Sequence, residues 1–468
     1  MTILREQPAE FDAHTPVAVI GAGACGLVAA LAARERGADV IVLEQDDTPT
    51  GTTAMSYGAI CAAGTELQNA AGIDDSADLL HEDILTATRS ATDSGHARTI
   101  ADNAGPTVDW LVNRHGIELT VETSWTGLGH RHPRLHAPVN RSGQTLMNML
   151  QTACERSDVG IVTQARVSAL YADSASRVAG FAVTRPDGSQ EHMSCDAAIL
   201  ATCGFGANRA LVQKHIPELA QATYYGHEGN TGSGISWGRD LGGKLADMGA
   251  FQALGSLAVP QSLVMPHTLL IGGGVQVNAD GERFENELHD ISGQALEILR
   301  QPGAVCWMVF DHRLHEQALK TFDEYRSAEE IRTAKRAESW SELAAATGLP
   351  NRALGKTMGD VAKLCESGDA DRFGRCFNRD DALNPPFYAI KVTGALFHTQ
   401  GGLVVDDTAR VRATDDTLLP NLFAGGGAAR SVSGPGGWGY LPGIGLCTAV
   451  TLGRLAGVGA ARMTSLDA

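Results

Sequence analysis

The sequence lacks the features of metal-cluster, secreted and membrane-spanning proteins. Its nine cysteines include no C-x-x-C pair, so we expect reduced cytoplasmic thiols and no zinc site, iron–sulfur cluster or disulfide framework. Residues 1–15 are polar and acidic, which argues against a signal peptide. The most apolar stretch, residues 441–461, contains Pro442, several glycines and Arg454, and therefore predicts a buried helix and no membrane span.

Basic residues are also scarce, with 37 Lys and Arg against 54 Asp and Glu and a net charge of −17. This balance argues against nucleic acid or an anionic membrane as a partner. An anionic small substrate is compatible with it only where local positive groups receive the charge. The 468 residues, of which 43% are hydrophobic, are enough for a large core and predict two domains.

The clearest motif follows the first apolar run, at residues 16–20. The spacing G-x-G-x-x-G predicts a strand, a phosphate-binding turn and a helix. Gly21 permits the tight turn, Gly23 lets the backbone approach a pyrophosphate, and Gly26 lets the helix pack on the strand. A second apolar run ends in Glu44, about 20 residues later, where an acceptor for ribose hydroxyls belongs. Together these predict a dinucleotide site; the alternative is a close-packed glycine turn without a ligand.

Three further segments have a composition that suits a ligand site. Residues 50–60 are small and hydroxylated, as in a segment running along a cofactor or in an ordinary polar loop. Residues 198–206 read as an apolar strand closing on a second glycine turn, as expected where a strand passes the cofactor again. Residues 125–136 are dense in His and Arg, which indicates either a funnel for an anionic substrate or a loop whose bases pair with nearby acids.

The chain changes in character between residues 224 and 384, where charges and helical stretches become more frequent. We therefore predict an inserted second domain over 224–384, between two parts of a first domain at 1–223 and 385–468. Apolar spacing predicts helices over 76–115, 144–155, 328–346 and 354–366.

The motifs GAGACG, TGTTAMSYG, GERFENE, PPFYAIKV, HTQGGLVVD, LFAGGGAA and GYLPGIG occur in this order over nearly the whole chain. In this order they resemble the flavoprotein family of fumarate reductase, succinate dehydrogenase and 3-ketosteroid 1-dehydrogenase. The resemblance implies an α/β fold, with a Rossmann-like FAD-binding domain and an inserted α+β capping domain that meets the substrate. It also implies non-covalent FAD, because TGTTAMSYG lacks the histidine that carries FAD in the respiratory members. The residues then expected to hold FAD are Gly21, Gly23, Ala24, Gly26, Glu44, Thr52, Thr53, Ser56, Gly58, Gly426, Gly427, Gly443 and Ile444.

Departures from the family pattern suggest which reaction to expect. In fumarate reductases an arginine after the Asn-Glu of the capping domain protonates the substrate; here His289 falls nearest that position. A second arginine, which clamps a carboxylate, is replaced by Tyr440. Tyr440 and Gly443 instead match the tyrosine and glycine N–H that hold the ketone oxygen in the ketosteroid branch. His398 keeps the family's histidine in H-T-x-G-G, on the substrate side.

The resemblance therefore predicts an FAD-dependent α,β-dehydrogenation of a cyclic ketone, most simply a small keto acid such as 4-oxocyclohexanecarboxylate. Alternatives are a 3-ketosteroid dehydrogenase and a fumarate-reductase-like reduction of an enoate or enone. Tyr440 and Gly443 would polarise the carbonyl, and His289 would take the α-proton, with Tyr57, Tyr224 and Tyr225 as alternative bases or donors. The electron acceptor stays open between oxygen, a quinone and a dye.

Overall fold

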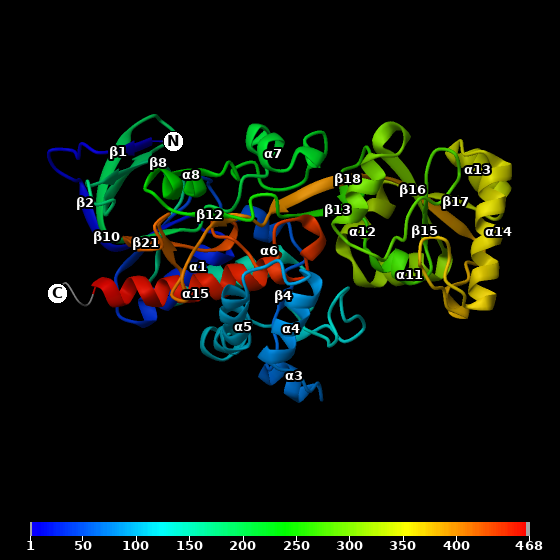
Figure 1. Cartoon of the computed structure of the whole chain (residues 1–468), viewed down its shortest axis with the longest axis horizontal. Coiled ribbons are helices and arrows are strands. Elements are labelled where there is room, and N and C mark those ends of the chain that lie inside the picture. The colour runs from blue at the N-terminus through cyan, green and yellow to red at the C-terminus, as the bar shows by residue number, and fades with distance from the viewer. Residues whose placement is uncertain (1, 465–468) are drawn as a thin grey trace. The chain divides into compact units, whose positions relative to one another are not determined.

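The protein is described by a computed structural model that covers residues 2–464. Within this range the chain forms two compact units (Figure 1). Unit 1 comprises residues 2–217, 226–251 and 398–464, and unit 2 comprises residues 218–225 and 252–397. The chain passes between the units at residues 217–218 and 225–226, and within two long strands, β13 (Phe251–Ala258) and β18 (Phe387–Thr399).

A nine-stranded sheet forms the centre of unit 1. Its parallel part runs in the order β7 (Gly160–Val162), β3 (Val40–Leu43), β2 (Ala13–Ile20), β10 (Gln190–Leu200) and β21 (Leu418–Ala424). Val19 of β2 pairs with Val42 on one side and with Ile199 on the other. Antiparallel strands β8 (Arg166–Ala172) and β9 (Val178–Thr184) extend the sheet beside β10. The carboxyl ends of the parallel strands therefore lie along one edge, where ligands bind in such sheets.

Helices α1 (Ala24–Glu35) and α15 (Ile444–Thr464) pack against each other beside this sheet (Figure 1). Small residues make this contact possible, because a Cβ on Gly453 or Gly457 would lie 2.5 and 2.1 Å from the carbonyl oxygens of Cys25 and Ala29. By length and composition α15 could cross a membrane, but 61% of its most apolar window is buried inside the protein. The helix therefore belongs to the core of unit 1, as the sequence predicted.

The remaining elements of unit 1 are short strands and the helices that surround the sheet. Its other helices are α2 (Gly51–Ala54), α3 (Glu66–Ala70), α4 (Ala77–Ala87), α5 (Ser94–His115), α6 (Gly143–Arg156), α7 (Arg209–His215) and α8 (Ser233–Asp240). Its other strands are β1 (Thr2–Leu4), β4 (Ile60–Cys61), β5 (Thr120–Val121), β6 (Leu135–Ala137), β12 (Leu245–Ala246), β19 (Gly402–Leu403) and β20 (Arg410–Arg412). The helix predicted over 76–115 is two helices, because Asp93 caps the second by accepting the backbone N–H of His96.

Unit 2 is built around β18, which pairs with strands on both of its edges. Its other strands are β11 (Thr223–Tyr224), β14 (Leu263–Val264), β15 (Val275–Val277), β16 (Val305–Asp311) and β17 (Lys335–Ala337). Its helices are α9 (Thr268–Ile271), α10 (Gly293–Leu299), α11 (His312–Thr321), α12 (Asp323–Glu330), α13 (Trp340–Thr347) and α14 (Asn351–Ser367). The single helix predicted over 328–346 is wrong, since β17 interrupts it and pairs with β18.

The compact units differ from the predicted insertion over 224–384 at both ends. Residues 226–251 belong to unit 1, because Gly234 of α8 packs on Thr202 and Gly238 packs on Leu403. Residues 385–397 belong to unit 2, because the strand they form is hydrogen-bonded to β16.

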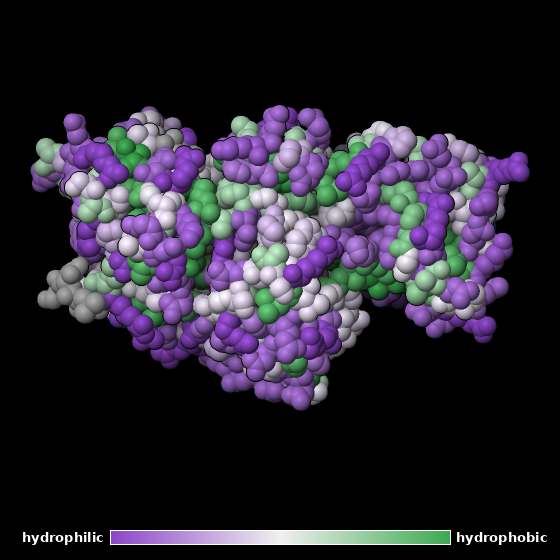
Figure 2. Space-filling view, in the orientation of Figure 1, coloured by the Kyte–Doolittle hydropathy of each residue, from purple (hydrophilic) through white to green (hydrophobic). Residues whose placement is uncertain are grey.

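Hydrophilic side chains cover most of the face seen in Figure 2. Among the described residues, the large hydrophobic side chains that are exposed are Met55, Val139 and Ile331. Met55 and Val139 lie in unit 1, and Ile331 lies in unit 2.

Candidate active site

Unit 1 contains a cavity of about 610 Å³ at the carboxyl edge of its parallel sheet. This volume is in the range of small-molecule and cofactor sites. The residues predicted to hold the cofactor that line it are Gly21, Gly23, Ala24, Glu44, Thr52, Thr53, Gly426 and Gly427. The second glycine turn predicted from the sequence also borders the cavity, through Ala201, Thr202 and Cys203.

The first glycine turn has a steric reason for each of its glycines. Gly21 has φ +106°, and a Cβ there would lie 2.5 Å from the carbonyl oxygen of Ala201. A Cβ on Gly26 would lie 1.9 Å from the carbonyl oxygen of Gly21. At Gly23 the nearest atom to a Cβ would be Thr53 Oγ1, at 3.8 Å. The backbone at Gly23 thus borders open cavity just before the N-terminus of α1, an arrangement that suits a pyrophosphate.

Glu44 connects the end of β3 to this turn. One carboxylate oxygen accepts the N–H of Ala22 at 2.9 Å, and the other accepts the N–H of Asp46 at 3.1 Å. Two carboxylate oxygens offer about four acceptor positions in all, so Glu44 keeps acceptor capacity for ribose hydroxyls. The sequence predicted that Glu44 accepts ribose hydroxyls. It did not predict that Glu44 also accepts the backbone N–H groups of Ala22 and Asp46.

A segment that the sequence analysis missed, residues 227–233, also lines the cavity. At one end His227 Nε2 lies 2.9 Å from Asp46 Oδ2. Further along, Asn230 Nδ2 donates to Thr52 Oγ1 at 2.6 Å. The segment is therefore attached both near Glu44 and near the predicted flavin-binding residues. The glycines at positions 229, 232 and 234 were the available signal.

A smaller cavity of about 100 Å³ shares Thr52, Thr53, Gly426 and Gly427 with the larger one. Its other lining residues include Ser56, His398 and Gln400, and none of its described lining residues is Arg or Lys. Ser56 was predicted to line the flavin, and His398 was predicted to face the substrate. The compartment offers neutral hydrogen-bonding groups and no fixed positive charge.

Tyr440 lies against His398, with 5.8 Å between ring centroids and an edge-to-face angle of 68°. Burial lowers the pKa of His398 to about 4, so this imidazole is neutral near pH 7. Burial raises the pKa of Tyr440 above its ordinary value, so the phenol keeps its proton. In the part of the chain that the structure describes, the Tyr440 hydroxyl has no hydrogen-bond partner. It is a protonated donor, and Tyr440 is not among the residues that line either cavity.

Four of the residues predicted to hold the cofactor do not line either cavity, namely Gly26, Gly58, Gly443 and Ile444. Gly443 has φ +77° and its carbonyl accepts the N–H of Cys61 at 3.2 Å. Ile444 is 1% exposed and its side chain packs in the core. Gly58 has φ +70°, and a Cβ there would lie 3.0 Å from the carbonyl oxygen of Ser142. Contacts of Gly443 and Ile444 with a cofactor therefore remain predictions for their backbone atoms.

The candidate bases lie in different surroundings. Tyr57 is half-buried in unit 1, and burial raises the pKa of its phenol above the ordinary value. His289 is an exposed residue of unit 2, in a turn where its N–H donates to the carbonyl of Asn286. Tyr225, also in unit 2, donates its hydroxyl to Glu324 at 2.9 Å and so already has a partner.

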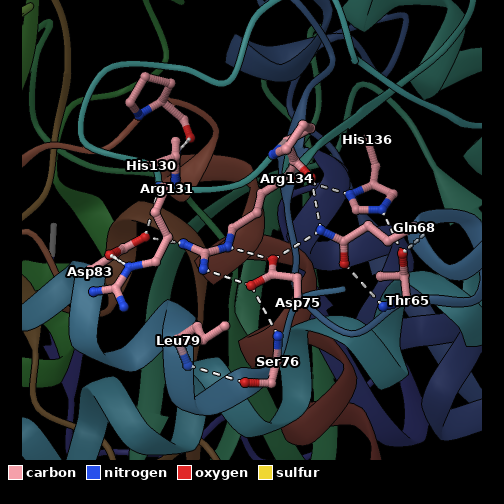
Figure 3. Close-up of polar contacts among 12 residues, drawn as sticks. Thr65, Gln68, Asp75, Ser76, Leu79, Asp83, His130, Arg131, Arg134 and His136 are labelled. Carbon is pink, nitrogen blue, oxygen red and sulfur yellow. Dashed lines mark hydrogen bonds and ion pairs between the residues drawn. The ribbon is translucent and has the colours of Figure 1, made fainter. Parts of the chain in front are cut away.

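The loop over 130–136 is not the anion funnel that its composition suggested (Figure 3). Arg134 is fully buried and its guanidinium pairs with Asp75 at 2.6 Å and with Asp83 at 2.5 Å. Arg131 pairs with Asp83 at 2.6 Å as well. His130 Nε2 lies 2.9 Å from the carbonyl oxygen of Pro442. The alternative interpretation, that these bases pair with nearby acids, is the one the structure supports.

The chain's similarity to known proteins agrees with this geometry. The sequence profile of a family described as "FAD binding domain" matches residues 16–446. A fumarate reductase (cytochrome) of Shewanella frigidimarina is 29% identical over 449 residues, which are 95% of this chain and 77% of the relative. The open conformation of a flavocytochrome c3 fumarate reductase superimposes with a TM-score of 0.83 at 28% identity, covering 97% of this chain and 79% of that chain.

A ketosteroid dehydrogenase is also similar in structure. The 3-ketosteroid Δ4-(5α)-dehydrogenase of Rhodococcus jostii superimposes with a TM-score of 0.77 at 25% identity, covering 97% of this chain and 98% of that chain. The glycine turn, the open backbone at Gly23 and the acceptor capacity of Glu44 fit the pyrophosphate and ribose of FAD. The chain belongs to the FAD binding domain family and is an FAD-dependent oxidoreductase.

Proposed function

We propose that this protein catalyses the α,β-dehydrogenation of a cyclic ketone, an oxidation of a CH–CH group. The observation that carries the proposal is the Tyr440 hydroxyl, a protonated and unpartnered donor among the described residues, beside the neutral His398. FAD, when bound, supplies a two-electron acceptor for the hydride. The residues proposed to hold it without a covalent bond are those of the glycine turn, Glu44, Thr52, Thr53, Gly426 and Gly427.

Tyr440 is proposed to donate its O–H to the ketone oxygen. As the α-proton leaves, negative charge develops on that oxygen, and the hydrogen bond becomes stronger. By the family resemblance the N–H of Gly443 would be a second donor. These two groups would therefore lower the barrier to proton removal in the way that an oxyanion hole does.

His289 is the proposed base for the α-proton, since imidazole is the side chain most often used for proton transfer near neutral pH. Tyr57 remains the alternative, but its raised pKa makes a phenolate scarce at that pH. His398 has a pKa lowered to about 4 and is a weak base, so we propose that it contacts the substrate as a hydrogen-bond donor.

The size and charge of the ketone depend on which groups are free to receive it. A keto acid such as 4-oxocyclohexanecarboxylate needs a receptor for its carboxylate, and Arg131 and Arg134 are already paired. We therefore propose a cyclic ketone, with the small keto acid and a 3-ketosteroid as the two classes to compare. The similarity to the Rhodococcus jostii dehydrogenase favours the steroid class.

Two further proposals concern the cellular location of the protein and its electron acceptor. All nine cysteines are free thiols, which suits the cytoplasm. The electron acceptor is proposed to be oxygen, a quinone or a dye-like carrier.

The second candidate function is reduction of an enoate or enone. The identity to the Shewanella frigidimarina fumarate reductase favours it. The absence of Arg and Lys from the described lining of the smaller cavity argues against a dicarboxylate such as fumarate, which needs fixed positive partners.

Anaerobic mixing of the purified flavoprotein with candidate ketones distinguishes these functions. The panel is cyclohexanone, 4-oxocyclohexanecarboxylate and a 3-ketosteroid, followed at the oxidised flavin band near ~450 nm. Bleaching by one ketone supports desaturation and selects its class. No bleaching by any of them, together with reoxidation of dye-reduced enzyme by an enoate, would replace the proposal with the reductase function.

A further inference from the structure

His398 is held from its far side by Gln400, two residues along the chain. The side-chain nitrogen of Gln400 lies 2.7 Å from Nδ1 of His398. With the amide oriented in this way, its NH₂ group donates and Nδ1 is the acceptor in this bond. A neutral imidazole that accepts at Nδ1 carries its proton on Nε2.

A third residue contacts the other end of the Gln400 amide. Ser433 Oγ lies 3.0 Å from Gln400 Oε1, where the hydroxyl can donate to the amide oxygen while the amide nitrogen faces His398. Gln400 is 4% exposed and Ser433 is 1% exposed, so water does not compete for either group. The backbone of Gln400 is fixed too, because its N–H donates to Ala250 and its carbonyl accepts from Ser431, both at 2.8 Å.

The opposite side of the His398 ring lies near the start of α15. A Cβ on Gly445 would lie 3.3 Å from Nε2 and 3.0 Å from Cε1, so glycine leaves room for the ring there. His398, Gln400 and Gly445 all line the smaller cavity. Burial lowers the pKa of His398 to about 4, in agreement with a neutral ring.

We propose that Gln400, oriented by Ser433, fixes His398 as the Nε2–H tautomer and so makes it a hydrogen-bond donor toward the substrate. Gln400 is then a positioning residue, and His398 is excluded as the base, since Nδ1 is occupied and Nε2 is protonated. With Tyr440, the site has two neutral donors and selects a substrate with an acceptor oxygen of the carbonyl type. The substrate part of this inference rests on the proposed function; the tautomer does not.

The tautomer is measured directly by ¹⁵N NMR of histidine-labelled protein loaded with FAD. The His398 signals are assigned as those lost in His398→Asn. The proposal expects a non-protonated Nδ1 and a protonated Nε2 at pH 7. A proton on Nδ1, as a flipped Gln400 amide would require, overturns it.

Two variants of Gln400 connect the tautomer to catalysis. In Gln400→Glu a carboxylate faces Nδ1 and draws a proton there, while in the similarly sized Gln400→Met nothing fixes the tautomer. We expect the NMR signals to show Nδ1 protonation in Gln400→Glu, with kcat/KM lower by about tenfold or more and FAD content unchanged. Gln400→Met should show a mixture of tautomers and a smaller loss.

Unchanged tautomer populations in both variants would overturn the proposal. If the wild-type protein turns over no ketone, the proposed function fails, and the tautomer measurement still tests the role of Gln400. If Gln400→Glu does not fold, the wild-type spectrum and the spectrum of Gln400→Met still test whether Gln400 fixes the tautomer of His398.

Discussion

The hydroxyl-bearing ring of Tyr440 meets the ring of His398 edge to face, with centroids 5.8 Å apart, inside unit 1. Neither ring carries a charge near pH 7, because burial lowers the pKa of the imidazole and raises the pKa of the phenol. Two uncharged donors placed side by side suit a ketone oxygen on which charge appears only during reaction.

Replacing Tyr440 by Phe removes the O–H and keeps the ring that packs on His398. We expect kcat/KM for the ketone to fall by about 10²–10³-fold, the usual loss for one oxyanion donor. FAD content and thermal stability should stay the same, since the hydroxyl has no partner among the described residues. Stopped-flow flavin bleaching measures the change, and a Tyr440→Phe enzyme as fast as wild type would exclude this role.

The segment over 227–233 predicts an effect on cofactor retention. Asp46→Asn weakens the pair with His227 Nε2, which is 2.9 Å long and only partly exposed. We expect the Kd for FAD to rise by roughly threefold to tenfold, as for the loss of one hydrogen bond. Equilibrium ultrafiltration with FAD fluorescence measures the Kd.

Asp47→Asn is the matched control, because it makes the same change of charge at the neighbouring exposed residue. It should leave the Kd for FAD unchanged. Equal weakening by both variants would mean that only the overall charge near the cavity matters.

The buried pair of Arg134 and Asp75 predicts a large effect on stability (Figure 3). Burial opposes ionisation of Asp75, but hydrogen bonds from Arg134 outweigh it and lower the pKa of the carboxyl. Arg134→Met leaves the buried Asp75 without its cation and Asp83 with Arg131 alone, at a cost of about 3–5 kcal/mol. Arg114→Met is the control, since its pair with Glu35 is 69% exposed on the Arg114 side and contributes about 0–1 kcal/mol. Urea unfolding at pH 7 measures the free energy of unfolding of both variants. Equal losses of stability in the two variants would contradict this prediction.

The pH dependence of stability follows from buried neutral histidines. Burial lowers the pKa to about 4 in His96, His130, His136, His267 and His398. Their folded pKa lies below the ordinary value near 6.5, so the unfolded chain binds more protons and stability is lost as pH falls from about 6.5 to about 4. Burial raises the pKa of Glu285 to about 9 and raises the pKa values of Asp109, Asp247 and Glu324 as well, and these carboxyls act in the opposite direction.

Urea midpoints at pH 8, 6.5 and 5 measure this slope. The expected result is a clear loss of stability between pH 6.5 and pH 5. His130→Gln should reduce the slope, whereas His312→Gln at an exposed site should not. Constant stability down to pH 5 would contradict the assignment of these histidines as neutral.

Local patterns in the sequence were sufficient for the glycine turn, Glu44 and the last helix. In each of these cases the residues that determine the structure lie close together in the sequence, so their spacing alone identifies them. The placement of residues 226–251 was not accessible in this way, because it depends on Gly238 packing against Leu403, far along the chain.

Long-range pairing also explains other differences between the predictions and the structure. The cations of the loop over 130–136 looked free because their partners, Asp75 and Asp83, lie some 50 residues earlier. Gln400 carried no signal in the sequence, since its proposed role depends on its contacts with Ser433 and with His398. The strand at 387–399 looked like a return to the first domain, although its hydrogen bonds are with strands of unit 2.

The most direct test of the central claim compares a ketone with the same ring lacking the carbonyl. Cyclohexanone and cyclohexane, or 4-oxocyclohexanecarboxylate and cyclohexanecarboxylate, are mixed anaerobically with wild-type enzyme and with Tyr440→Phe, and flavin bleaching is followed. The account predicts bleaching of the wild type by a ketone, none by its carbonyl-free partner, and slow bleaching of Tyr440→Phe. Bleaching that does not depend on the carbonyl, or that is unchanged in Tyr440→Phe, would contradict the claim that Tyr440 holds a ketone oxygen.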